Sequence, residues 1–194
     1  MAQPAPQAAR PAVQRPSPLV VGTVVWLSSE LLFFSGLLAA WFTLRAEATG
    51  PWPPEGAEVD APYAFVLTVL LVASSVTMHQ AVAALRDDDR VRFRRRLALT
   101  AGLGAAFLAG QVVEWARLPF TPGDSAFGST FVTLTGFHGA HVLGGVVAMA
   151  VLLGRAADVR FGADDLPRVE VVSWYWHFVD SVWLVLFAVL YLLA

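Results

Sequence analysis

The sequence predicts an all-α membrane protein, a bundle of five transmembrane helices, and three observations support this fold class. Of its 194 residues, 57% are hydrophobic and only 14% are charged, whereas a soluble domain has about 45–50% apolar and about 25% charged residues. The apolar residues fall into five blocks, each near the ~20 residues that cross a ~30 Å hydrocarbon core. The blocks do not alternate in polarity as the strands of a transmembrane barrel would, so each block is expected to be a helix.

The predicted spans cover residues 19–44, 61–85, 97–116, 129–154 and 171–194. Residues 1–18 are rich in Ala, Pro and Gln, and we expect them to form a disordered tail because they cannot bury apolar area. The first block is too long for the apolar region of a signal peptide and contains Glu30, so we expect it to remain in the mature protein. Residues 19–194 are expected to form one five-helix domain.

The distribution of arginine predicts the orientation of the chain. Arginine supplies all 13 basic residues, and only Arg45 and Arg117 lie in the first and third connections. The other eleven lie in the tail, the second connection and the fourth connection. By the positive-inside rule that side is cytoplasmic. An odd number of spans then places the N-terminus in the cytoplasm and the C-terminus outside.

Two predicted helices contain small residues at intervals of four. These small-residue stripes are Ala98, Gly102, Ala106 and Gly110 in the third helix, and Gly136, Ala140, Gly144 and Ala148 in the fourth. Small residues at this spacing let helix backbones approach closely in a membrane. The stripes therefore predict tight packing, unless Ala and Gly are simply common in this chain.

Three acids, Glu30, Glu114 and Asp180, lie inside predicted spans, and no arginine lies inside a span to pair with them. A charge at the bilayer centre costs at least ~2.5–3.5 kcal/mol on insertion scales. We therefore expect these acids to be hydrogen-bonded, neutral, or facing trapped water or lipid. At a rise of 1.5 Å per residue, Glu30 and His141 lie near the same depth, so the two side chains are expected to meet at mid-membrane.

The histidines raise the alternative of a metal site. His138 and His141 are three residues apart, a spacing that places them on one helix face, and with Glu30 or Asp180 they form a conceivable ligand set. A haem would favour a second histidine at equal depth, and His177, which shares a helix face with Asp180, is nearer the cytoplasm. Histidines hydrogen-bonded to neighbouring helices are the favoured interpretation, and proton exchange or lipid contact is the other alternative. The absence of cysteine excludes disulfides and thiolate metal sites.

Aromatic residues and arginines add candidates for packing and lipid contact. Trp183 lies three residues beyond Asp180, and Trp183 and Trp26 are candidates for specific packing or lipid contact. Trp174 and Tyr175 fit an interfacial aromatic belt. The arginine-rich second connection is a topology determinant or attracts anionic lipid headgroups at ~1 kcal/mol per arginine.

Four strings resemble one family, subunit III of the haem–copper terminal oxidases. They lie in order on four of the five predicted helices: Trp26–Gly36 (WLSSELLFFSG), Gln111–Phe120 (QVVEWARLPF), Phe127–His141 (FGSTFVTLTGFHGAH) and Trp174–Trp183 (WYWHFVDSVW). The resemblance covers roughly residues 18–194 and is greatest to the five-helix, actinobacterial cytochrome c oxidase form. It identifies the residues of the family motifs as Glu30 of SELLFF, His138 and His141 of FHGAH, His177 and Asp180 of WYWHFVD, and Glu114 after the glutamine of the third helix.

The resemblance implies an accessory, non-catalytic subunit III of an aa3-type cytochrome c oxidase in a bacterial plasma membrane. Such a subunit packs against subunit I, alongside subunit II and other respiratory-complex subunits. It stabilises subunit I, supports proton uptake and holds phospholipid in a cleft. No cofactor is expected on this chain, because haem and copper belong to the partner subunits, and no nucleic-acid partner is implied.

One departure from the family concerns the cleft. The longer form has seven helices, and the first two, which help to wall the lipid cleft, have no counterpart here, so a neighbouring subunit or lipid must cover that face. Subunit III of a quinol oxidase or an accessory subunit of nitric oxide reductase is an alternative within the family. A small proton-coupled transporter built on Glu30, Glu114 and Asp180 is disfavoured, because the sequence has no obvious inverted repeat.

Overall fold

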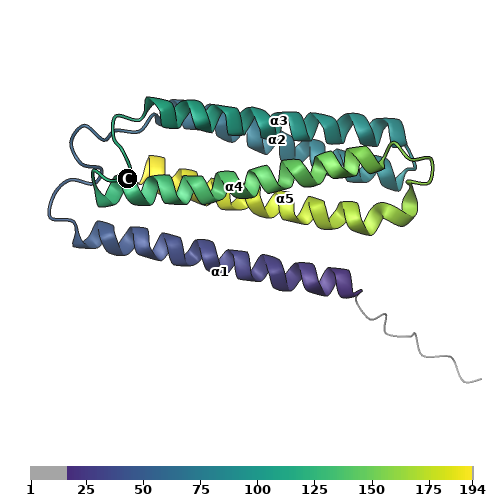
Figure 1. The fold of residues 1–194 in the computed structure, drawn as a ribbon, viewed down its shortest axis with the longest axis horizontal. Coiled ribbons are helices and arrows are strands. Elements are labelled where there is room, and N and C mark those ends of the chain that lie inside the picture. The colour runs from purple at the N-terminus through teal and green to yellow at the C-terminus, as the bar shows by residue number, and fades with distance from the viewer. Residues whose placement is uncertain (1–16, 194) are drawn as a thin grey trace, which may run out of the picture.

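The computed structural model describes residues 17–193 and contains five long helices connected up and down (Figure 1). They are α1 (Pro18–Glu47), α2 (Ala61–Arg86), α3 (Arg90–Arg117), α4 (Ala126–Arg155) and α5 (Leu166–Phe187). A short 3-10 helix, Ala163–Asp165, precedes α5, and a π-helical turn, Ala188–Leu192, continues it. All five helices are long and apolar enough to cross a membrane. The predicted all-α fold with five spans is therefore confirmed.

The helices extend beyond the predicted spans mainly at their polar ends. α3 begins at Arg90 rather than near residue 97, because the Asp89 carboxylate accepts the backbone N–H of Arg92 at 2.9 Å and caps the helix. Arginine is also a good helix former, so the basic segment continues the helix out of the apolar span. Pro18, assigned above to the tail, is the first residue of α1, and Ser17 caps it. The rest of the predicted tail, residues 1–16, lies outside the described residues.

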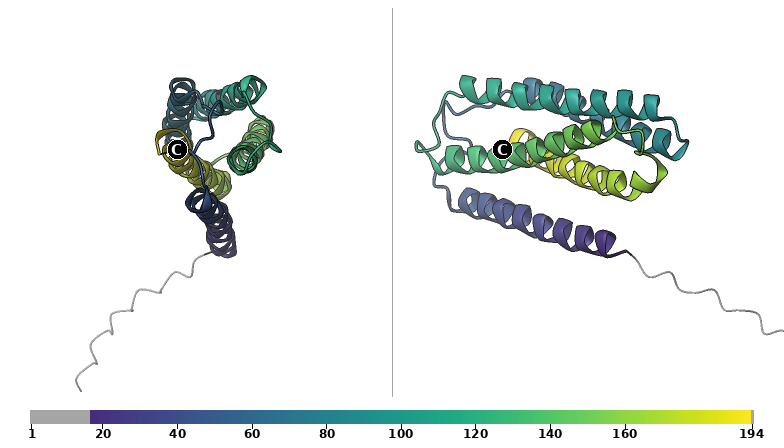
Figure 2. Two further views of the ribbon diagram at one scale, coloured as in Figure 1. Left: turned by 90° about the vertical axis from the view of Figure 1, so that its left-hand side faces the viewer. Right: turned by 45° about the vertical axis from the view of Figure 1, so that its right-hand side comes forward.

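Helices α2 to α5 form a four-helix bundle, and α1 lies along its outside against α4 and α5 (Figure 2). The buried residues of α1 are only Thr23, Phe34 and Trp41. Its outer apolar side chains are open, and Leu32, for example, is 73% exposed. The first helix is therefore the one least covered by the rest of the chain.

The arginine-rich segments gather at one end of the molecule, the end where α1 begins (Figure 1). There the Arg86 side chain pairs with Glu170 at 2.6 Å, and Arg90 Nη1 donates to the Val159 carbonyl at 2.7 Å. These contacts join the ends of α2 and α3 to α5 and to the connection that precedes it. The connections after α1 and α3, which are poor in arginine, lie at the opposite end.

The close approaches between helices involve one glycine of the predicted stripes, Gly110, where a Cβ would clash with the Leu67 side chain, and other glycines outside the stripes. Most residues of the small-residue stripes face outward. A Cβ at Gly102, for example, would meet nothing within 4 Å. A Cβ at either Gly104 or Gly145 would come within 2.6 Å of the Trp176 indole. The prediction of tight packing along the stripes is therefore confirmed at Gly110 and wrong for outward positions such as Gly102. The space around the fully buried Trp176 is provided by Gly104 and Gly145, which lie outside the stripes.

Two glycines of α3 give a matched test of this packing. We expect Gly104→Leu to destabilise the chain by about 1–3 kcal/mol, because the new side chain overpacks against Trp176. Gly102→Leu gains the same helix propensity but points into open space, so its unfolding temperature in mild detergent should not fall. Equal loss in both variants would contradict the packing described here.

Candidate functional site: acids and histidines held between helices

The first pair of polar side chains joins α1 to the bundle. Glu30 Oε2 lies 3.0 Å from His141 Nε2 of α4, and the two side chains are 21% and 17% exposed. The Trp26 Nε1–H donates to the other carboxyl oxygen, Oε1, at 3.0 Å. The predicted meeting of Glu30 with His141 is therefore confirmed.

The hydrogen bonds of His141 restrict where its protons lie. Its Nδ1 is 2.7 Å from the Phe137 carbonyl oxygen, which only accepts, so Nδ1 must carry a proton. If the ring is neutral, Nε2 has no proton, and the Glu30 carboxyl must be protonated to donate to it. If the ring is charged, Nε2 donates to a carboxylate. Glu30 and His141 therefore share one proton in either state.

Aromatic side chains enclose this shared proton. The rings of Phe34 and His141 meet edge to face with centroids 5.0 Å apart. Tyr175 of α5 stacks on Trp26 at 5.0 Å and donates its hydroxyl to the His141 carbonyl at 2.8 Å. Tyr175 is thus buried against α1 and α4.

His138 lies in a different environment from His141. It is fully buried in the four-helix core, stacked on Trp183 at 4.9 Å and edge-on to Phe107 at 5.6 Å. Neither of its ring nitrogens has a hydrogen-bond partner among the described residues. The two histidines are one turn apart on α4, as expected, but His138 points into the four-helix core and His141 points toward α1.

A second polar group lies between α2 and α5. The Ser75 hydroxyl is 2.6 Å from His177 Nδ1. Asp180, one turn further along α5, is buried, and neither carboxyl oxygen has a hydrogen-bond partner among residues 17–193. The Ser75 hydroxyl also lies near the Asp180 carboxyl but is not hydrogen-bonded to it. His177 and Asp180 therefore share one neighbouring hydroxyl on α2, as their common helix face predicts.

The third acid, Glu114, lies at the opposite end of the bundle. Its Oε1 accepts the Tyr191 hydroxyl at 2.8 Å, and its Oε2 has no partner among the described residues. Glu114 also lines a small pocket with Glu58, Asp60 and Arg117. The carboxyl is thus tied to the end of α5 on one side and adjoins charged loop residues on the other.

Hydroxyl groups of α2 accept hydrogen bonds from two tryptophans of the bundle. Trp183 Nε1–H donates to Thr68 at 2.9 Å, and Trp176 Nε1–H donates to Ser74 at 3.0 Å. The specific packing predicted for Trp183 is confirmed, but the partner residues were missed. Serines and threonines are common inside membrane helices, and their sequence positions alone do not show which of them face a tryptophan.

Within residues 17–193, no group of three or more His, Cys, Asp or Glu residues is arranged to hold a metal ion. The ligand set considered for His138, His141 and either Glu30 or Asp180 does not assemble. His138 points into the aromatic core, His141 is bonded to Glu30, and Asp180 lies at the interface of α2 and α5.

The fold and these sites define a multi-pass helical membrane protein whose intramembrane acids and histidines lie at helix interfaces. The family model for cytochrome c oxidase subunit III matches residues 9–194. The chain is 45% identical over 182 residues to the probable cytochrome c oxidase subunit 3 of Nocardia farcinica, covering 92% of this chain and 90% of that protein.

Two further relatives extend this comparison. Cytochrome c oxidase subunit 3 of Corynebacterium diphtheriae is 44% identical, over 93% of this chain and 90% of its own. The protein of the same name from Danio rerio is 39% identical, over 88% of this chain and 67% of its own. The chain therefore belongs to the cytochrome c oxidase subunit III family and is a subunit of that oxidoreductase complex.

The hydrogen bonds of Glu30 lead to a direct prediction. Glu30→Gln should be close to wild type in thermal stability, because its amide can donate to His141 and accept from Trp26. Glu30→Leu should cost about 1–2 kcal/mol, because it leaves both partners unpaired. Glu47→Leu, on the exposed end of α1, is the control for loss of charge. If the Gln variant were as unstable as the Leu variant, the hydrogen-bonding role would be refuted.

Proposed function

We propose that this chain is the accessory, non-catalytic subunit III of an aa3-type cytochrome c oxidase. In this role it packs against subunit I, stabilises it, holds lipid beside it and supports proton uptake into it. Haem and copper reside in the partner subunits, and the electron donor is cytochrome c. Membership of the family supports a place in the oxidase complex, where the chain would act as an accessory subunit.

The observation that best supports this role is the use of the intramembrane polar groups. Glu30 bonds to His141 across two helices, and Glu114 bonds to Tyr191. His177 bonds to Ser75. Each contact joins two helices of this chain, which is how a protein that acts as a scaffold would use its polar residues in a bilayer.

The outer faces of the helices support a role in covering a partner and holding lipid. α1 is apolar, yet only a small share of it is buried inside the chain. Between α3 and α4 an apolar groove is lined by Leu108, Val112, Trp115 and Leu143, with Gln111 at its side. In the assembled oxidase we expect subunit I and lipid chains to cover these surfaces.

The shared proton of Glu30 and His141 supports the proposed part in proton uptake. Both side chains are partly exposed at the outer edge of the bundle, and the pair can hold a proton on either residue without gaining net charge. Transfer of this proton between the two residues leaves the net charge of the pair unchanged, which keeps the desolvation penalty small.

The gathering of arginines at one end supports the proposed orientation. We assign that end, where α1 begins, to the cytoplasm, and the end of α5 to the outer side of the bacterial plasma membrane. Because the chain lacks cysteine, a single cysteine at Asp88 can be labelled selectively. An impermeant thiol reagent should reach it only from the cytoplasmic side, and labelling from the outside would overturn the orientation.

Substitutions in the complete oxidase test the accessory role. We expect Glu30→Ala and Asp180→Ala to leave the haem spectrum unchanged but to increase loss of this subunit during purification or shorten the activity lifetime during turnover. Glu47→Ala at the exposed end of α1 should behave as wild type. An altered haem spectrum with this subunit still bound would contradict a purely supporting role.

A further inference from the structure

We propose that Arg92, Arg95 and Arg96, at the start of α3, form a binding site for the phosphate of an anionic phospholipid headgroup. The site lies on the lipid-facing side of α3, away from the interface of α1 with the bundle. This inference deepens the lipid-holding part of the proposed function and rests on it.

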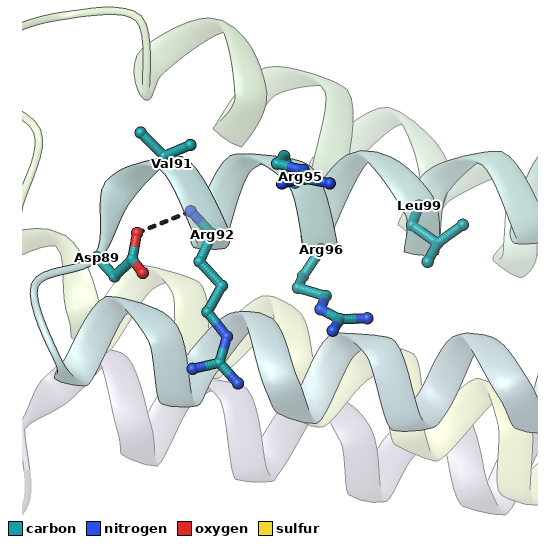
Figure 3. Close-up of a pocket in the computed structure, with 6 residues that line it drawn as sticks. All are labelled: Asp89, Val91, Arg92, Arg95, Arg96 and Leu99. Carbon is teal, nitrogen blue, oxygen red and sulfur yellow. Dashed lines mark hydrogen bonds between the residues drawn. The ribbon is translucent and has the colours of Figure 1, made fainter.

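The three arginines line one hollow on the surface. Its walls are completed by Asp89, Val91 and Leu99 (Figure 3). Arg92 and Arg96 are one helical turn apart, and Figure 3 shows their side chains leaving α3 in the same direction. The one acid of the hollow, Asp89, already accepts the backbone N–H of Arg92. The hollow thus combines three guanidinium groups with one carboxylate that is partly engaged in the helix cap.

Four of the other six described arginines at this end of the molecule are bonded within the chain. Arg86 pairs with Glu170, Arg155 and Arg168 both contact Asp165, and Arg90 donates to a backbone carbonyl. Among residues 17–193, by contrast, no hydrogen bond or ion pair involves the side chains of the three arginines in the hollow. These guanidinium groups are therefore available to an anionic ligand from outside the chain.

The chemistry of the hollow fits phosphate. The planar guanidinium group donates parallel N–H bonds to two oxygens of one phosphate group, an arrangement that an apolar ligand cannot accept. Two such groups one turn apart can contact the same phosphate from adjacent positions. An anionic headgroup near a membrane surface is attracted by about 1 kcal/mol per arginine even without a specific site.

The surroundings of the hollow favour a lipid over a free anion. Val91 and Leu99, which line the same hollow, are 70% and 46% exposed, so hydrocarbon can contact them. Further along α3 the outward positions Ala98, Gly102 and Ala106 are exposed small residues, and they leave a shallow surface against which an acyl chain can lie. A ligand with a phosphate at one end and hydrocarbon at the other matches both halves of this surface.

The test uses the intact oxidase complex exchanged into phosphatidylcholine and titrated with phosphatidylglycerol, with bound lipid counted by native mass spectrometry. The variant is Arg92→Gln with Arg96→Gln. The control is Arg94→Gln with Arg160→Gln, which removes the same charge from residues that do not line the hollow. Both double variants lose the general attraction of the two removed charges. Only the variant also loses charge-assisted hydrogen bonds to the phosphate, so we expect it to weaken half-occupancy of the tightest phosphatidylglycerol site about tenfold more than the control does.

Three results would overturn the site. Equal weakening in variant and control would show that only net charge matters. Displacement of the lipid by millimolar inorganic phosphate would show a small-anion site. Loss of a neighbouring subunit from the variant alone, with lipid affinity unchanged, would assign the arginines to a protein contact. If only net charge matters, or if the site binds a small anion, this subunit still remains bound to the oxidase. The accessory role, which is tested separately with Glu30→Ala, would then be unaffected.

Discussion

In a bilayer a buried polar side chain needs a hydrogen-bond partner on a neighbouring helix. The hydrogen bond between Glu30 and His141 is the most important example in this chain, because it attaches α1 to the bundle. α1 buries little of its own surface, and apolar contact between helices gives no hydrophobic driving force within lipid. The bond from Glu30 to His141, supported by Trp26 and Tyr175, fixes the height and rotation of α1 against the bundle. The placement of the first helix therefore rests on a few polar atoms rather than on a large apolar interface.

The same rule explains the interior of the bundle. Trp183 and Trp176 fill the core, and each places its single indole donor on a hydroxyl of α2. Gly104 and Gly145 make room for the ring of Trp176. Large rings supply dispersion contacts and glycines supply space, while the indole hydrogen bonds select one register of α5 against α2.

Much of this arrangement follows from the sequence, because the length of each span and the depth of each residue can be calculated from the residue count. The five spans and the meeting of Glu30 with His141 depend only on the apolar blocks and on the rise per residue. Depth does not fix rotation about the helix axis, and this is why the different neighbours of His138 and His141 were missed. Nor does spacing show which glycines face a tryptophan. The space left by Gly104 is set by Trp176, 72 positions along the chain, so the outward direction of the small-residue stripes could not be predicted.

The functional account follows from these interfaces. A chain whose intramembrane acids and histidines are held by its own helices can present a fixed apolar surface to a catalytic partner, and its shared protons stay near the membrane interior without net charge. The arginine-rich end adds a polar boundary at the membrane surface, where paired arginines hold the loops and unpaired ones face outward.

A double-mutant cycle between Glu30 and His141 tests the central claim most directly. Both residues are changed to Leu, singly and together, and the free energy of unfolding is measured in a bilayer mimic. The account predicts a coupling of about 0.6–1.7 kcal/mol, the range measured for hydrogen bonds between membrane helices. A coupling of zero would contradict it, because α1 would then be held by something other than this bond.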